Sequence, residues 1–497
     1  MTEEKKCRYV SPPDHRGEAH SCQFESEVQG EDPPIQLAGL NFCKYHAPIS
    51  SDLLARDYGV EVLANNGQFK ENWDAARCRQ LNSDIRAMLV RHAANRTWCD
   101  LTGVSFPSGF DASNMNHPSV SFKAAKFDGL TANFRGANFV NANSDNKGID
   151  FSHAEFLGNT DFHGALFPAS GAVFQDAKFV GAANFNNAQF LGLAVFVQTT
   201  FSGGGVRFVE TKFSKSGAFF HRAHFWLRDD GSELDFSVPF EPNSVKNEEY
   251  SLQNLVFFDS QIEVPTSFDN RNFEGSISFH RTRFWFAPTF FGCSLHQDTE
   301  FPTIEYFEDT VGDERAYRTL RLAMKQQEAH DEEAMFWALE QRTKRNNLDP
   351  KQPKHWFPWV LSWGYDLLSE YGLNATRPLG WLVCWLLFYG LLVYDNLNAT
   401  SACWKDHVYA DQWLTIPGKT LWPEIWSSCE KIVSFSIAQS ARPFFIWGDY
   451  EGTNITTTLG PSAFMFWVKL AATFDSAVSL TLVALFILAV RRRFRMQ

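Results

Sequence analysis

The sequence motifs that mark common enzyme classes are missing from this chain. It contains no phosphate-binding P-loop, no G-x-G-x-x-G dinucleotide motif, no G-x-S-x-G nucleophile elbow and no H-E-x-x-H metalloprotease motif. Its histidines are scattered and pair with no obvious nucleophile. We therefore expect a protein that is not an enzyme.

An apolar signal core is also missing from residues 1–20, which are rich in charged side chains. We therefore expect the N-terminal part of the chain to lie in the cytosol, where thiols stay reduced. The cysteines of this part are then free thiols or metal ligands rather than disulfide partners.

Four of the N-terminal residues have the chemistry of a closed metal site. They follow the pattern C-x14-C-x20-C-x2-H, formed by Cys7, Cys22, Cys43 and His46. Three thiolates and one imidazole suit structural zinc and leave no open position for catalysis. The closing C-x2-H resembles small treble-clef-like zinc modules, over residues 7–46. We predict a zinc-binding module over 1–50, with free cysteines as the alternative and His15 or His20 as possible substitute ligands.

Phenylalanine recurs along the middle of the chain at alternating steps of five and six residues. The two clearest runs are Phe174, Phe179, Phe185, Phe190, Phe196, Phe201 and Phe268, Phe273, Phe279, Phe284, Phe290, Leu295, Phe301. A small residue stands two positions before most of these phenylalanines, as Ala177 does before Phe179. Side chains two apart on a strand share a face, so both should fill one interior as parallel ladders. A repeat this short predicts a coiled β stack.

Local motifs within this repeat resemble the A-N/D-L/F-x-x unit of the pentapeptide-repeat family, in its phenylalanine-rich form. The clearest are Ala132-Asn133-Phe134-Arg135-Gly136 and Ala137-Asn138-Phe139. The resemblance spans roughly 101–225 and 257–301 and implies a mainly β fold, a right-handed quadrilateral β-helix over 101–312. The chain departs from the family by an extra residue in every second unit, which should bulge the corners. Residues 226–256 break the repeat and are expected to form a loop or an edge hairpin.

Some members of this family mimic DNA and bind topoisomerase, which needs an acidic rod. Residues 119–225 carry nine Lys and Arg against seven Asp and Glu, so most of this rod is slightly basic. Residues 226–314 carry five Lys and Arg against eighteen Asp and Glu. Because only this segment is acidic, a DNA-mimic inhibitor is a weak alternative. We expect no nucleic-acid partner.

Two segments without Pro or Gly flank the repeat. Residues 71–97 place Trp73, Ile85, Met88 and Leu89 on one helical face, which predicts a helical cap within 51–100. Residues 313–346 alternate acidic and basic groups and predict one long helix or a helical hairpin, within a connector over 313–355.

Residues 356–497 are expected to form a membrane unit. The aromatic segment 356–371 predicts an interfacial helix, and 377–397 and 464–490 predict two spans. The second span ends at the basic group Arg491, Arg492, Arg493 and Arg495, which favours cytoplasmic N- and C-termini. We expect a two-span protein of the cell inner membrane that contacts lipids.

Two charged residues interrupt the second span, Lys469 near its outer end and Asp475 deeper in. Lys469 can reach the interface, whereas an intramembrane carboxylate usually faces protein or water. Asp475 is expected either to accept a hydrogen bond from a neighbouring helix or to join a ring of carboxylates in an oligomeric pore.

The segment 424–450, between the spans, has helical spacing that breaks at a proline. Span, short helix and span together resemble the two-helix pore module of tetrameric channels, although no TVGYG-like filter is present. The pore-like residues of this segment would be Ser436, Gln439, Arg442 and Pro443. Cys403 and Cys429 lie between the spans, where an oxidising space would allow a disulfide.

Taken together, these patterns predict a membrane-anchored pentapeptide-repeat protein. The leading hypothesis is a homo-oligomeric channel-like or membrane-permeabilising effector controlled by its cytosolic β-helix, which would bind a ligand or a protein partner. The main alternative is a non-conducting scaffold that presents the β-helix to a protein partner.

Overall fold

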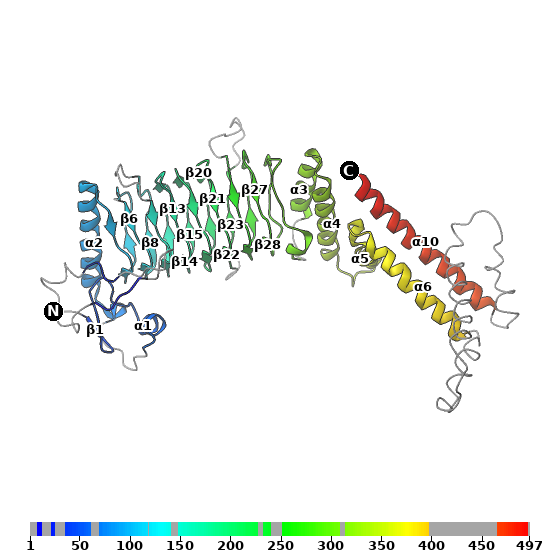
Figure 1. The fold of residues 1–497 in the computed structure, drawn as a ribbon, viewed down its shortest axis with the longest axis horizontal. Helices are drawn as coiled ribbons and strands as arrows, with labels where there is room; N and C mark the ends of the chain where they lie inside the picture. The colour runs from blue at the N-terminus through cyan, green and yellow to red at the C-terminus, as the bar shows by residue number, and fades with distance from the viewer. Residues whose placement is uncertain are drawn as a thin grey trace, which may run out of the picture. The chain divides into compact units, whose positions relative to one another are not determined.

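The fold is known from a computed structural model. It describes residues 7–11, 21–24, 35–60, 69–117, 119–140, 148–226, 232–239, 251–308, 314–396 and 465–495. The chain divides into two compact units, Met1–Asn346 and Asn347–Gln497, and each is built differently (Figure 1).

The centre of the first unit is a β-solenoid of short parallel strands stacked coil upon coil (Figure 1). Sheet 1 has eight strands: β4 (Ser105–Phe106), β7 (Lys126–Phe127), β10 (Glu155–Phe156), β14 (Lys178–Phe179), β18 (Thr200–Phe201), β22 (His224–Phe225), β25 (Gln261–Ile262) and β28 (Arg283–Phe284). Sheet 2 also has eight: β3 (Cys99–Asp100), β6 (Val120–Ser121), β9 (Ile149–Asp150), β13 (Ala172–Val173), β17 (Ala194–Val195), β21 (Ala218–Phe219), β24 (Leu255–Val256) and β27 (Ile277–Ser278).

Two further sheets complete the coils. Sheet 3 has seven strands: β5 (Phe110–Asp111), β8 (Thr131–Asn133), β11 (Asn159–Asp161), β15 (Ala183–Asn184), β19 (Val206–Arg207), β23 (Leu234–Asp235) and β26 (Thr266–Ser267). Sheet 4 has three: β12 (Leu166–Phe167), β16 (Gln189–Phe190) and β20 (Lys212–Phe213). The repeat β-solenoid expected from the phenylalanine spacing is confirmed.

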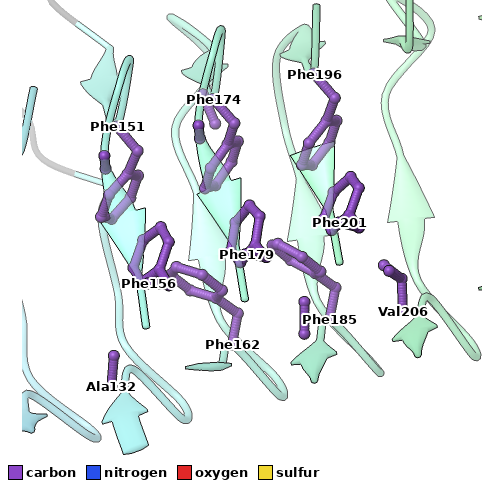
Figure 2. Packing of buried hydrophobic residues seen from close by; sticks show 14 of the residues in the cluster. Ala132, Phe151, Phe156, Phe162, Phe174, Phe179, Phe185, Phe196, Phe201 and Val206 are labelled. Carbon is purple, nitrogen blue, oxygen red and sulfur yellow. The ribbon is translucent and has the colours of Figure 1, made fainter. Parts of the chain in front are cut away.

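The interior of the solenoid is filled by stacked phenylalanine rings (Figure 2). Phe156 lies 4.6 Å from Phe179, and Phe174 lies 4.8 Å from Phe196, with interplanar angles of 8° and 2°. These separations match the spacing of neighbouring strands, about 4.8 Å, because each ring stacks on the equivalent ring of the next coil. Ala154 and Ala177 are buried beside them, which confirms the alanine ladder.

The corners explain why Asn or Asp so often precedes the phenylalanine. The Asp161 carboxylate accepts a hydrogen bond from the His163 backbone N–H at 2.9 Å, and the Asn184 side chain accepts one from Asn186 N–H at 3.1 Å. Such side chains favour turns because they satisfy the backbone locally. Corner residues with positive φ, such as Asp176 at 56°, complete the change of direction.

The expected break at 226–256 is wrong for residues 232–239 and for 251–256, where β24 pairs with β21 and β27. Within 232–239, β23 pairs with β19 and β26, and Phe236 stacks between Phe208 and Phe268 at 4.7 and 5.1 Å. The reason is that Leu234 and Phe236 keep the two-residue spacing of the interior positions although the surrounding sequence lacks the repeat. Residues 227–231 and 240–250 lie outside the described part of the chain.

One charged side chain, Arg271, lies inside the solenoid at a position where other coils place a small residue. It is 1% exposed and donates hydrogen bonds to the carbonyls of Thr211 at 2.9 Å, Phe208 at 2.8 Å and Phe236. One coil earlier, the carbonyl equivalent to that of Thr211 belongs to Ala188 and accepts the backbone N–H of the next coil. The guanidinium thus satisfies an acceptor at the sequence interruption.

Helices lie at both ends of the solenoid. α2 (Ala75–Asn95) buries Leu81, Ile85, Met88 and Leu89, and its first turn is capped by the Asp74 side chain. At the other end, η4 (Ile304–Tyr306) leads to α3 (Glu314–Gln326) and α4 (His330–Asn346), which form a helical hairpin. The hairpin is one of the two arrangements expected for 313–346.

The second unit is helical. Its described elements are α5 (Trp356–Ser369), η5 (Glu370–Gly372), α6 (Thr376–Asn396) and α10 (Met465–Arg495). Large apolar side chains of α5 are exposed, namely Trp356, Phe357, Val360, Leu361, Trp363 and Leu367. Among the described helices, one segment, Thr473–Arg491, is long and apolar enough to cross a membrane. The expected first span, 377–397, lies only partly within the residues whose side chains are described, so this measure does not test it.

Candidate metal centre and buried helix carboxylate

A tight hairpin presents two of the four predicted metal ligands. β1 (Ile35–Leu37) and β2 (Leu40–Phe42) pair antiparallel through Ala38 and Gly39, whose φ values of 50° and 80° fit a two-residue hairpin turn. Cys43 follows β2 directly, and the backbone N–H groups of His46 and Ala47 donate to its carbonyl. The chain therefore turns sharply enough to bring both side chains of the C-x2-H motif to one point.

The four predicted ligand side chains meet in one cluster. The candidate ligand atoms of Cys7, Cys22, Cys43 and His46 all lie within 4.8 Å of one another. The Cys22 and Cys43 sulfurs are 3.8 Å apart, and His46 Nδ1 is 3.4 Å from the Cys43 sulfur and 3.7 Å from that of Cys7. A tetrahedral ion with Zn–S bonds of 2.3 Å would place its sulfurs about 3.8 Å apart. The donor set and its spacing are compatible with zinc.

The second ring nitrogen of His46 is held by the solenoid. His46 Nε2 lies 2.9 Å from the Thr102 carbonyl, and the His46 ring stacks on Tyr9 at 4.0 Å. A proton donated from Nε2 to this carbonyl leaves the Nδ1 lone pair facing the cysteines, which is the tautomer that a metal requires. The Cys/His cluster and the first coil are therefore in direct contact.

The cluster also favours one thiolate. Hydrogen bonds from Cys22 and Cys7 hold the pKa of the Cys43 thiol far below its usual range, although burial opposes this. Thiolate is the form that binds a metal ion.

No family model matches this chain. Comparison with the curated proteins and with the solved structures also gave no match. The function must therefore be inferred from the chemistry of the chain itself.

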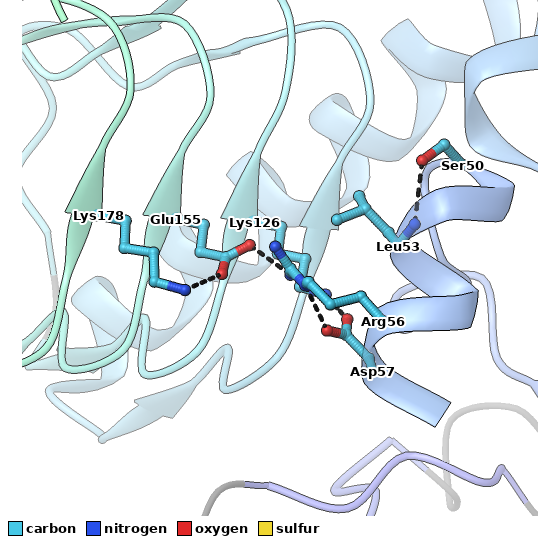
Figure 3. Close-up of polar contacts among 7 residues, drawn as sticks. All are labelled: Ser50, Leu53, Arg56, Asp57, Lys126, Glu155 and Lys178. Carbon is cyan, nitrogen blue, oxygen red and sulfur yellow. Dashed lines mark hydrogen bonds and ion pairs between the residues drawn. The ribbon is translucent and has the colours of Figure 1, made fainter. Parts of the chain in front are cut away.

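Buried and half-buried ionic groups fasten the metal module to the solenoid (Figure 3). α1 (Ser51–Tyr58) places Arg56 2.6 Å from the Glu155 carboxylate of β10, which also lies 3.3 Å from Lys178. Next to this pair, Asp57 contacts Lys126. The cations outweigh the effect of burial and lower the pKa of Glu155 below its usual range.

A second fastening point is Lys70, which is 1% exposed. Its ammonium donates to the carbonyls of Tyr45 at 2.8 Å and Ser105 at 2.6 Å, so it joins the segment that carries Cys43 and His46 to the first coil of sheet 1. Burial lowers its pKa to about 7. Neither Lys70 nor Thr102 was among the predicted site residues, because nothing in their local sequence marks a lysine or a carbonyl as a docking group.

In the helical unit, Asp475 is fully buried between α10 and α6. The Trp385 indole N–H of α6 donates to its carboxylate at 2.9 Å, and the Trp385 ring contacts Phe474 edge-on at 5.9 Å. The first of the two expected environments for Asp475, a hydrogen bond to a neighbouring helix, is thus observed. The hydroxyls of Tyr389 and Ser479 are also buried in this unit, without a hydrogen-bond partner among the described residues.

The other predicted site residues cannot be placed. Lys469 lies in α10, but its side chain is not described. Outside the described residues lie Ser436, Gln439, Arg442, Pro443, Cys403, Cys429, His15 and His20. The pore-like segment and the possible disulfide therefore stay predictions.

Proposed function

We propose that this chain is a membrane-anchored pentapeptide-repeat protein whose helical unit is an oligomeric channel-like or membrane-permeabilising effector, controlled by a cytosolic, right-handed β-helix with a structural zinc site. The stacked Phe and Ala ladders and the four sheets of the solenoid support the family assignment. The spacing of the cysteine and histidine ligands supports zinc.

The observation that carries the membrane part of the proposal is the buried carboxylate of Asp475 within an apolar helix segment. An ionisable side chain is costly in such a segment and commonly marks an ion or proton pathway. Tyr389 and Ser479 add buried hydroxyls that a plain anchor would not need. A single helical hairpin cannot enclose a pore, so conduction requires several copies around an axis.

The proposed topology has two spans in the inner membrane, with α6 as the first and α10 as the second. The exposed apolar face of α5 suits the headgroup layer, where Trp and Tyr are favoured. The basic residues after Thr473–Arg491 would keep the C-terminus in the cytoplasm.

A non-conducting, membrane-anchored scaffold is the second candidate. It is favoured by the Trp385–Asp475 hydrogen bond, which satisfies one carboxylate oxygen within a single chain. In this function the helical unit holds the solenoid at the membrane, where it presents its surface to a protein partner.

Ion flux from liposomes containing the purified full-length chain separates the two functions. The channel-like function predicts flux that Asp475→Asn strongly reduces, because the substitution removes the charge and keeps the side-chain shape. Thr481→Val is the matched control, since Thr481 lies on an exposed position of the same helix. Absence of flux from the unmodified protein would show that the channel-like function is wrong and leave the scaffold.

A further inference from the structure

A polar groove of about 670 Å³ lies on the outer surface of sheet 1, near its C-terminal end. It spans three successive coils, because His224, Gln261 and Arg283 occupy the same register position in β22, β25 and β28. The volume is within the range of small-molecule sites, about 300–1,000 Å³. In sheet 1, strands β14 and β18 separate the groove from β7 and β10, which carry the side chains that α1 contacts.

Guanidinium groups are the dominant charged groups of this groove. Arg222, Arg281 and Arg283 line it, against the carboxylates of Asp259 and Glu263. Asp259 is shared, at 2.9 Å from Arg281 Nε and 3.9 Å from Arg222 Nε. The side chains of these two arginines are 54% and 67% exposed. Each guanidinium has five N–H donors, so one shared carboxylate leaves most of them available to an anion.

Aromatic rings stand beside these cations. Trp285 and Tyr306 line the groove, and the Arg283 guanidinium lies 5.7 Å from the Trp285 ring centre. Trp226, which directly follows β22, is 46% exposed, and its ring lies 4.4 Å from that of His224. An indole this exposed offers a flat apolar surface to a planar ring.

We propose that this groove binds a nucleotide. Phosphate oxygens would accept hydrogen bonds from Arg222 and Arg281, for which the planar guanidinium is well suited. The base would stack on the indole of Trp226 or Trp285, an interaction that tolerates different bases. Arg283 pairs with Glu308 at 3.3 Å and His224 with Glu263 at 3.1 Å, whereas Arg222 and Arg281 keep most of their surface exposed to an external ligand.

The binding site stands independently of ion conduction, although nucleotide binding would supply a ligand for the control that we propose for the β-helix. The test is calorimetry on the full-length chain in detergent with three probes: ATP, adenosine and tripolyphosphate. We expect ATP to bind more tightly than either partial ligand. Arg222→Ala and Trp226→Ala should each weaken ATP binding about tenfold, the effect of losing one charge-assisted or stacking contact.

Arg135→Ala is the matched control. Arg135 is 58% exposed and lies 3.9 Å from Asp161, an ion pair like that of Arg222 but near the opposite end of the solenoid. It should leave ATP binding unchanged. The proposal is overturned if ATP does not bind, if tripolyphosphate binds as tightly as ATP, or if Arg135→Ala weakens binding as much as Arg222→Ala. Because binding and flux are measured separately, failure of one is distinguishable from failure of the other.

Discussion

The two ends of the solenoid are closed by different chemistry. At the C-terminal end, Phe336 of α4 packs against Phe301 at 4.9 Å and Phe307 at 6.0 Å, so the hairpin extends the aromatic interior by one more layer. At the N-terminal end, the cysteines and the histidine of the module beside α2 converge on one point. Aromatic packing closes the C-terminal end, whereas we propose that closure of the N-terminal end depends on a bound ion and on reduced thiols.

Removal of the metal should produce the largest difference in stability between the two ends. We expect the purified protein to contain one zinc per chain and Cys43→Ser to lose it. Structural zinc contributes roughly 10 kcal/mol or more to folding in small modules, so the N-terminal module should unfold locally. Elemental analysis measures the metal, and hydrogen exchange should show faster amide exchange around residues 7–60 with little change in α3 and α4.

Cys293→Ser is the control for this experiment. Cys293 lies in the solenoid with its sulfur 3.0 Å from the Phe268 carbonyl, and serine can make the same hydrogen bond, as Ser260 does to Phe220. This variant should keep its zinc. A chain that contains no zinc, or whose N-terminal exchange is unchanged by Cys43→Ser, contradicts the proposed difference between the ends.

Truncation of Phe336 should destabilise the C-terminal end of the solenoid. Phe336→Ala removes a fully buried ring and should lower the free energy of unfolding by about 3–5 kcal/mol, measured by denaturant titration. Its zinc content should stay at that of the unmodified chain. Leu322→Ala, on a half-exposed position of α3, should change stability by less than about 0.5 kcal/mol. Equal effects of these two variants would show that the hairpin does not seal the solenoid.

The smallest expected effect concerns the ion pairs between α1 and sheet 1. Because the folded state lowers the pKa of Glu155, its contribution to stability is fully present above the unfolded pKa of about 4.3 and is lost as pH falls through the folded value. Arg56 is 46% exposed, so Arg56→Ala should cost only about 0.5–1 kcal/mol at pH 7. Urea unfolding at pH 7 and at successively lower pH below about 4 should show this cost shrinking.

Acid alone should not distinguish the two ends. In α4, hydrogen bonds from Lys344 and Arg318 overcome the effect of burial and lower the pKa of Glu340 as well. The C-terminal hairpin should therefore also lose stability as pH falls below about 4. Selective loss of the N-terminal module on chelation at neutral pH, with both ends weakened in acid, would complete the comparison.

Much of the solenoid and the cluster of Cys7, Cys22, Cys43 and His46 could be predicted from the sequence, because both depend on residue spacing. The interior position of Phe179 and the pairing of Ala177 with it follow from a two-residue period. The C-x2-H motif likewise limits where Cys43 and His46 can point. Regular spacing can be recognised in a sequence without knowledge of contacts between distant residues.

The contacts that spacing does not encode were missed. Arg271 stands at a small-residue position, where a charged side chain suggests the surface, and its partners lie 35 or more residues earlier in the chain. The environment of Asp475 was left open between two possibilities, since the identity of its partner, Trp385, depends on how two helices pack.

The hydrogen bonds of Arg271 have a consequence for how such a solenoid tolerates insertions. The rings of Phe208, Phe236 and Phe268, which lie before and after residues 240–250 in the sequence, stay stacked. One long side chain reaching back across two coils donates to the carbonyls of Phe236, Thr211 and Phe208. A corner stabilised in this way can accept extra residues without disturbing the neighbouring coils. It is therefore a suitable place for grafting new loops onto the solenoid.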